Sequence, residues 1–193
     1  LSRDDGLRLA AERGRRMQAL PAGGAMTSLE ADGATVTRLL QQIGSDAVIA
    51  AVNAPARTVV AGTTEAIAAV EAACAAAHIS VRRLNVRHAF HSPLMAPMQA
   101  GFADVLAGVS YQTAQTTFVS GSWGGVVPAH EILGADYWQT QVRAPVQFAG
   151  GVAALAGLGC GGVGEVGPGG RLGGAGPTGG GGPPAAGGAA ARG

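Results

Sequence analysis

Hydrophobic positions at the start of the chain recur at helical spacing. Between Ser2 and about Leu20 the apolar side chains fall near one face, and Ser2 followed three residues later by Asp5 resembles a capping box. The Pro-Ala-Gly-Gly run at 21–24 then interrupts the pattern. The sequence therefore predicts a helix over 2–20.

A compact alternation of strand and helix patterns follows. Asp32 is placed to cap a helix whose apolar face ends at Ile43, and Thr63 or Thr64 is placed to cap a second helix that runs to His78. The runs that alternate as strands are residues 24–30, 46–53, 57–62 and 80–86. The order βαββαβ is typical of a ferredoxin-like unit, which we assign to residues 23–87.

The second half of the chain is patterned more weakly. We predict a helix over 95–109, a strand over 116–121, and a helix, a break at Pro145 and a second helix within 136–155. Residues 150–193 then hold 20 of the 33 glycines of the chain. Glycine has no side chain to bury, so a glycine-rich segment cannot bury enough apolar surface to offset the entropy lost on ordering. We therefore expect the segment 171–193 to be disordered.

Composition excludes several classes of protein. The formal net charge of the 193 residues is only +1 and the cations are scattered, so we expect no nucleic-acid partner. No run approaches the ~18 apolar residues of a membrane span, and the charged start does not resemble a signal peptide. Two cysteines without a spacing pattern fit a reducing compartment, so we expect a cytoplasmic protein. Leu1 in place of an initiator methionine indicates that the chain is cut from a longer protein.

The segment HAFHSP directly after the last predicted strand contains His88 and His91, three residues apart. A zinc site needs three or four ligands, and neither His78 nor His130 has a neighbouring cysteine or a pattern of acids, so we expect no metal. Two interpretations stay open from the residues alone. In the first, both histidines are loop residues whose rings are hydrogen-bonded to the backbone, and in the second, one of them acts as a general base.

Five segments, in order, resemble the acyltransferase domains of modular polyketide synthases, the malonyl-CoA:acyl carrier protein transacylase family. They are DGLRLAAERGRRMQALPAGGAM (5–26), VNAPARTVVAG (52–62), VRHAFHSPLMAPM (86–98), YWQTQVRAPVQF (137–148) and EVGPGG (165–170). The resemblance implies an α/β fold in which a ferredoxin-like small subdomain is inserted into an α/β-hydrolase-like core. Residues 1–22 would be a helix of the larger subdomain, and residues 88–170 would be the remainder of that subdomain.

The resemblance also implies roles for individual residues. His91 matches the catalytic base, and Gln141 matches a position whose backbone carbonyl accepts the other ring proton of that base. Arg13 matches the arginine that binds the malonyl carboxylate. His88 and Phe90 match positions that set the extender unit, with Phe90 filling the space that an α-methyl group needs.

The resemblance further implies that the complete domain binds no cofactor. It implies malonyl-CoA as substrate, transfer of malonyl to the phosphopantetheine thiol of an acyl carrier protein, and neighbouring polyketide synthase domains as further partners. The nucleophile of the family lies in a Gly-x-Ser-x-Gly elbow, which this sequence does not contain, so we expect the chain alone to be inactive. The alternatives are a free-standing or fatty-acid-synthase transacylase, and a non-catalytic remnant that only binds other domains.

Overall fold

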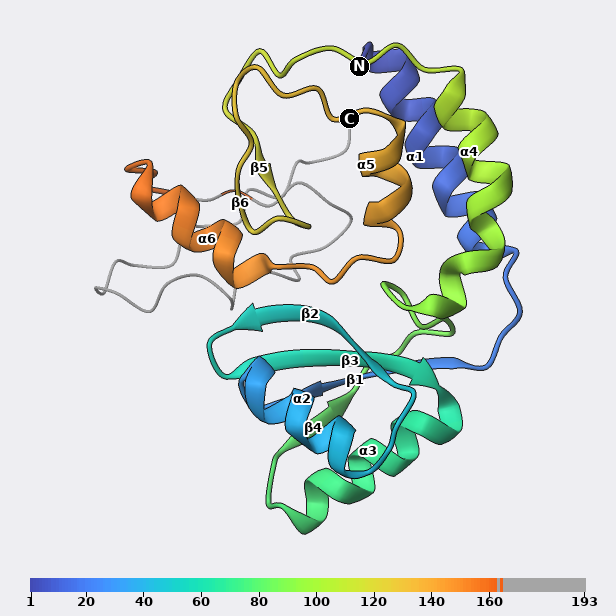
Figure 1. Ribbon diagram of the computed structural model, residues 1–193, viewed down its shortest axis with the longest axis vertical. Helices are drawn as coiled ribbons and strands as arrows, with labels where there is room; N and C mark the ends of the chain where they lie inside the picture. The colour runs from blue at the N-terminus through green and yellow to red at the C-terminus, as the bar shows by residue number, and fades with distance from the viewer. Residues whose placement is uncertain (163, 165–193) are drawn as a thin grey trace, which may run out of the picture. The chain divides into compact units, whose positions relative to one another are not determined.

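The computed structural model describes residues 1–162 and 164, and the segment 1–161 forms one compact unit. Four antiparallel strands make its main sheet in the order β2-β3-β1-β4 (Figure 1). They are β1 Gly24–Leu29, β2 Val48–Ala54, β3 Arg57–Thr63 and β4 Val81–Arg83. This order is that of a ferredoxin-like βαββαβ unit, so the predicted topology is confirmed.

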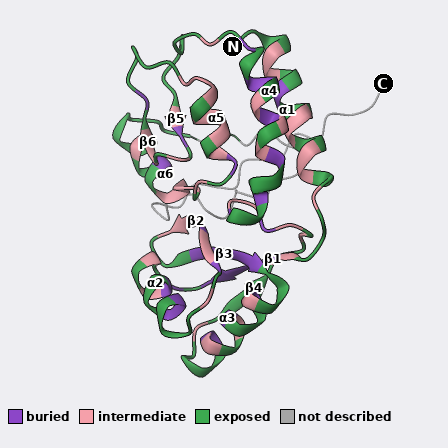
Figure 2. Cartoon of the chain, turned by 45° about the vertical axis from the view of Figure 1, so that its right-hand side comes forward, coloured by how far each residue is buried: buried purple, intermediate pink, exposed green. Residues whose placement is uncertain are grey.

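Helices α2 (Gly33–Gln42) and α3 (Thr64–Ala76) pack on one face of the sheet. Both begin at the predicted caps, because the side chain of Asp32 accepts from the Thr35 amide and that of Thr63 accepts from the Ala66 amide. The core beneath them is apolar and buried (Figure 2). Its least exposed members are Leu29, Val36, Val60, Ile67, Val70 and Cys74.

Ile43 corrects one prediction about that core. Its side chain was expected on the buried face of α2, but it stands at the C-cap and remains 38% exposed. The chain turns away immediately afterwards through Gly44, whose φ of +59° is left-handed.

The opposite face of the sheet is covered by the chain that leaves β4. Met26, Ala50, Val59 and Ala61 on the strands form a buried cluster with Ala89. The approach is so close that a β-carbon on Gly24 would collide with the backbone of His88 and Ala89. The segment HAFH is therefore held against β1 by backbone contact as well as by apolar packing.

Four of the remaining helices form a second core. They are α1 Arg3–Gln18, the 3₁₀ helix η1 Pro93–Met98, α4 Gln99–Ala107 and α5 Ala135–Gln141. The last helix, α6 Phe148–Gly157, contacts β2 instead. Leu9 of α1 packs with Met95, Met98, Phe102 and Leu106, and α1 lies beside α4 (Figure 1). The predicted helix over 95–109 starts instead as a 3₁₀ turn, because Pro97 has no amide hydrogen for an α-helical bond.

Two predicted strands are shorter than expected. The strand over 80–86 is limited to Val81–Arg83, after which Leu84 donates its amide to Met26 and the chain turns. The strand over 116–121 is only β5 (Val119–Ser120), paired with β6 (Gly125–Val126), which the sequence pattern did not predict. The segments EVGPGG (165–170) and 171–193 lie outside the described residues.

The break between α5 and α6, predicted at Pro145, connects to the sheet. Val146 accepts a hydrogen bond from the Val52 amide at 2.8 Å and donates one to the Ala50 carbonyl at 2.8 Å. These bonds form a parallel bridge between Val146 and Ala51 of the edge strand β2. The residues just before Val146 are thereby fixed relative to the sheet.

We expect Gly24→Ala to lower the free energy of unfolding by roughly 1–3 kcal/mol, because its methyl group would push the HAFH backbone off β1. Gly6→Ala in α1 is the matched control, since no atom lies within 4 Å of the place its methyl group would take and a helical alanine should stabilise by about 0.5–1 kcal/mol. Urea unfolding of both variants measures the difference. Equal effects of the two substitutions would contradict the close packing of HAFH on β1.

Candidate active site

His91 lies in the loop between β4 and η1 with a left-handed backbone, at a φ of +56°. This conformation is costly for a residue with a β-carbon and tends to occur where surrounding structure demands it. The next residue, Ser92, is buried, donates its hydroxyl to the Ala89 carbonyl at 2.6 Å and accepts from the Leu94 amide at 3.2 Å. Ser92 is thus committed to the turn that presents His91.

The imidazole of His91 is oriented by a backbone carbonyl. Its Nδ1 lies 2.8 Å from the oxygen of Ala144, and because a carbonyl only accepts, Nδ1 carries the hydrogen. The neutral ring therefore presents Nε2 as an acceptor. This arrangement provides what a general base needs, an oriented ring and a free lone pair.

Gln141 was predicted to supply the orienting carbonyl. In the structure the 2.8 Å hydrogen bond comes from Ala144, three residues further along, while the Gln141 backbone makes a lesser contribution that also raises the pKa of His91. Gln141 is the last residue of α5, where carbonyl groups have no partner within the helix. The side-chain Oε1 of Gln141 is buried and has no hydrogen-bond partner among the described residues.

Burial is the main influence on the protonation of His91 and lowers its pKa below the usual 6.5. The hydrogen bond to Ala144 opposes that shift, and the charge of Arg13 adds to it. The imidazole is therefore neutral at pH 7, the state in which it can accept a proton.

Arg13, Phe90 and His91 line one cavity of about 480 Å³, with α1 forming one wall and Trp138 of α5 another. The Arg13 guanidinium is half-buried, and among the described residues no carboxylate lies within ion-pair distance of it. Burial lowers its pKa and the nearby Tyr137 raises it, but an arginine stays charged at any physiological pH. The cavity is thus lined by a cation that favours an anionic ligand.

The neighbouring arginines of α1 are engaged elsewhere. Both Arg15 and Arg16 form ion pairs with Glu12 on the same helix. The choice of Arg13 among the arginines of this helix, which spacing alone did not justify, is thus the one that puts a guanidinium into the cavity of His91.

His88 is placed differently from the other predicted residues. Its Nε2 lies 3.0 Å from the carbonyl oxygen of Leu20, and its ring lies 6.0 Å from that of Phe90 between centroids. It lines a separate cavity, together with residues 20–24, instead of the one that holds Arg13. His88 thus lies beside the Phe90 ring but outside the cavity that Phe90 lines.

His91 also lines a second cavity, of about 450 Å³, that shares no other residue with the first. Its walls combine Val48 and Ile49 of β2 with the polar side chains of Gln99, Thr140 and Arg143. None of these residues was predicted to belong to a site. The signal for Arg143 was its place in QVRAPVQF, directly before Ala144.

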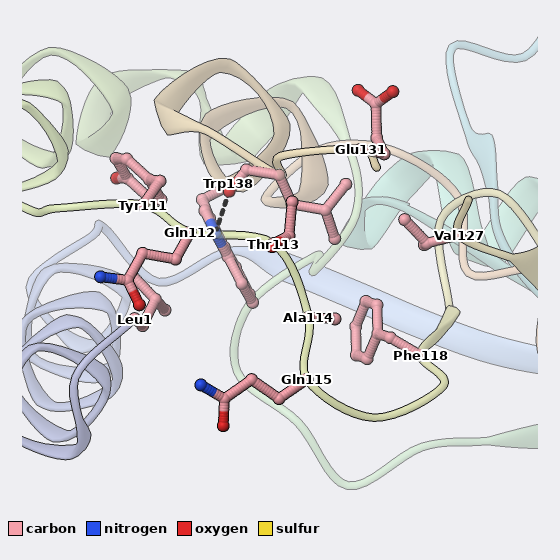
Figure 3. A pocket seen from close by; sticks show the side chains of 11 residues that line it. Leu1, Tyr111, Gln112, Thr113, Ala114, Gln115, Phe118, Val127, Glu131 and Trp138 are labelled. Atoms are coloured by element: carbon pink, nitrogen blue, oxygen red, sulfur yellow. Dashed lines mark hydrogen bonds between the residues drawn. The ribbon is translucent and has the colours of Figure 1, made fainter. Parts of the chain in front are cut away.

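A further cavity lies between the chain start and the loop 111–118 (Figure 3). Tyr111, Phe118 and Trp138 are among its lining residues, and the Trp138 indole donates to the Leu133 carbonyl at 3.1 Å. None of the predicted site residues reaches it. Within the described part of the chain, no cluster of three metal-binding side chains occurs and no helix has the length and apolarity to cross a bilayer.

Comparisons with known proteins agree with this geometry. A family model described as "Acyl transferase domain" matches residues 1–168. Polyketide synthase GfsA of Streptomyces halstedii is 46% identical over 88% of this chain, and mycoketide-CoA synthase of Mycobacterium tuberculosis is 41% identical over 88%. The chain spans only 2% and 4% of the length of these relatives.

Solved structures show the same fold. The acyltransferase domain from the second module of the salinomycin polyketide synthase is 41% identical, with a TM-score of 0.76 over 81% of this chain and 37% of that one. The malonyl CoA-acyl carrier protein transacylase from Clostridium perfringens, at 20% identity and a TM-score of 0.75 over 82% of this chain and 52% of that one, shares the fold alone.

The predicted fold class is confirmed by these neighbours, whose domains combine an α/β-hydrolase-like core with a ferredoxin-like subdomain. The sheet β1–β4 has the topology of that subdomain. The chain belongs to the family of acyl transferase domains of polyketide synthases.

Proposed function

We propose that this chain contains the acyl-binding pocket and the general base of a malonyl transferase. The complete domain would move malonyl from malonyl-CoA to the phosphopantetheine thiol of an acyl carrier protein during polyketide synthesis. The observation that carries the proposal is that Arg13, Phe90 and His91 line the same cavity.

The malonyl group suits this cavity at two points. Its free carboxylate can accept two parallel hydrogen bonds from the planar guanidinium of Arg13, each contributing about 1.5–3 kcal/mol as a charged hydrogen bond. The ring of Phe90 lines the same cavity and would occupy space that a larger α-substituent needs. A dicarboxylic acyl group without an α-methyl is therefore the preferred substrate class.

The chemistry requires a serine from a Gly-x-Ser-x-Gly elbow, which this sequence does not contain. In the complete domain, Nε2 of His91 would accept the serine hydroxyl proton as the oxygen attacks the thioester carbon. The carbon–sulfur bond then breaks, and the imidazolium returns the proton to the departing thiolate. The carrier thiol would then give its proton to His91 as its sulfur attacks the acyl-serine carbon. The carbon–oxygen ester bond breaks, and the imidazolium returns the proton to the serine oxygen.

The two alternative functions differ from this proposal in the relatives and in the upstream sequence that they predict. A free-standing transacylase is disfavoured because the relatives at 41–46% identity are polyketide synthases, whereas the transacylase neighbour is only 20% identical. A non-catalytic module would lack the serine altogether. Sequencing the DNA upstream of this reading frame distinguishes the two outcomes, because a Gly-His-Ser-x-Gly elbow should be encoded within about thirty codons.

We expect Arg13→Ala to weaken the binding of malonyl-CoA to this chain about tenfold or more, through loss of a charged hydrogen bond. Binding of acetyl-CoA, which has no free carboxylate, should not change. Isothermal titration of both thioesters measures this, with Arg15→Ala as the matched control because Arg15 is already paired with Glu12. Equal losses for the two thioesters would refute the role of Arg13.

Phe90→Ser should improve methylmalonyl-CoA binding relative to malonyl-CoA by about tenfold, the scale of one methyl group in a closed pocket. Adding His88→Tyr should preserve this change, since His88 lies beside the Phe90 ring but outside the cavity. Competition binding gives the ratio directly. Phe118→Ser, at an exposed aromatic residue outside the cavity, is the control, and an unchanged ratio for Phe90→Ser would rule out the steric account.

His91 should titrate below pH 6.5, because burial and the charge of Arg13 both lower its pKa. Arg13→Gln should raise the titration midpoint, whereas Arg15→Gln should leave it unchanged. Nuclear magnetic resonance of the imidazole protons reports both values. A midpoint that does not respond to Arg13→Gln would show that the charge of Arg13 does not act on the His91 imidazole.

The lowered pKa of His91 also makes the free energy of unfolding depend on pH. Below pH 6.5 the unfolded chain binds more protons than the folded one, so the contribution of neutral His91 is present above 6.5 and is lost as the pH falls through the lowered pKa. His91→Asn should flatten that part of the stability profile, which urea unfolding at a series of pH values measures.

A further inference from the structure

The second cavity beside His91 has walls of two kinds. Val48, Ile49, Pro93 and Pro145 supply apolar surface, and polar side chains stand at only a few points. This is the composition of a site for an extended and mainly apolar ligand that carries occasional hydrogen-bonding groups. Since His91 is the single residue common to both cavities, a group bound in the second one approaches the same base from a different direction.

Arg143 is the cation of this cavity, and Gln99 holds it in place. Nη1 of Arg143 donates to Oε1 of Gln99 at 3.3 Å, while Nε2 of Gln99 donates to the carbonyl of Gln139 at 3.3 Å. Gln99 is therefore fixed from both ends of its amide. No carboxylate of the described residues pairs with Arg143, so its other N–H groups are available to a ligand.

We propose that Arg143, positioned by Gln99, binds the thiol-bearing pantetheine arm by donating to the carbonyl oxygen of an amide in it. The identity of the ligand rests on the proposed acyl transfer, which needs a thiol delivered to His91. A pantetheine arm contains two amides and one hydroxyl group among methylene and methyl groups, which matches largely apolar walls with one cationic donor.

The location of Arg143 favours an amide over the phosphate at the other end of the arm. Arg143 directly precedes Ala144, whose carbonyl holds His91, and both residues line the same cavity. Arg143 is itself exposed and lines the cavity beside Ala144, so we place an amide of the arm, and not its phosphate, at the guanidinium. The phosphate lies at the opposite end.

The test measures the binding of three thiols to the 193-residue chain by following the His91 imidazole resonances. Pantetheine has two amides, N-acetylcysteamine has one, and 2-mercaptoethanol has none. Arg143→Ala should raise the dissociation constants of the two amide thiols about tenfold, the effect of one lost charged hydrogen bond. The dissociation constant of 2-mercaptoethanol should not change. If Arg143 only supported the fold, its loss would weaken the binding of all three thiols.

Further variants sharpen the result. Gln99→Ala should cause a smaller loss for the same two thiols, because Arg143 keeps its charge but loses its support. Arg143→Lys should retain part of the affinity and guards against misfolding of the alanine variant. Arg38→Ala is the matched control, since Arg38 is an exposed arginine on α2.

Three outcomes would overturn the inference. They are no measurable advantage of the amide thiols in the unaltered chain, an equal loss for all three thiols in Arg143→Ala, or a loss of acetate binding with pantetheine unaffected, which would mark a plain anion site. The proposed function is judged separately, by the Arg13-dependent binding of malonyl-CoA. An Arg143 effect without an Arg13 effect would reject the malonyl assignment and leave a pantetheine site.

Discussion

The hydrogen bond from His91 Nδ1 to the Ala144 carbonyl joins parts of the chain that are 53 residues apart. It forms only because each partner is fixed independently. His91 is presented by a turn that Ser92 closes and that lies against Gly24 of β1. Ala144 is held because Val146, two residues later, pairs with Ala50 and Val52 of β2. The sheet thus sets both ends of the bond without contributing a side chain to it.

The positive charge of Arg13 disfavours a second positive charge on the His91 imidazole. Burial lowers the pKa of His91 most, and the charge of Arg13 lowers it further, so the imidazole is neutral at pH 7. Under the proposed function, a carboxylate bound to Arg13 would offset the smaller part of that shift, which Arg13 causes, and would leave the part that burial causes.

The sequence predicted those elements whose signals are local. Asp32 and Thr63 cap helices because their side chains bond to amides three residues away, and that geometry needs no tertiary partner. The ends of strands were predicted poorly, because the chain turns away from β1 after the Leu84 amide has bonded to Met26, and β5 exists only by pairing with β6. Such limits depend on contacts between distant segments.

The candidate site shows the same division. Residue chemistry left His91 undecided between a loop residue and a base, and it could not separate Arg13 from its neighbours on α1. Resemblance proposed both, and the structure placed them in one cavity. The Ala144 carbonyl, which lies 2.8 Å from the ring, was not predicted beside the Gln141 backbone, because a backbone acceptor leaves no mark on the residue type. Arg143 escaped notice for a related reason, since its relevance depends on the cavity it faces.

The pairing of Val146 with β2 has a consequence for the construction of chimeric acyltransferases. Exchanging the ferredoxin-like sheet alone, or the segment 135–157 alone, would combine a β2 edge from one parent with a Val146 equivalent from another. Any mismatch in that short bridge would be transmitted through Pro145 and Ala144 to the imidazole, even though every side chain of the candidate site had been retained. Crossover points that keep β2 and the α5–α6 connection from the same parent preserve the alignment of the His91 ring, and those that separate them put it at risk.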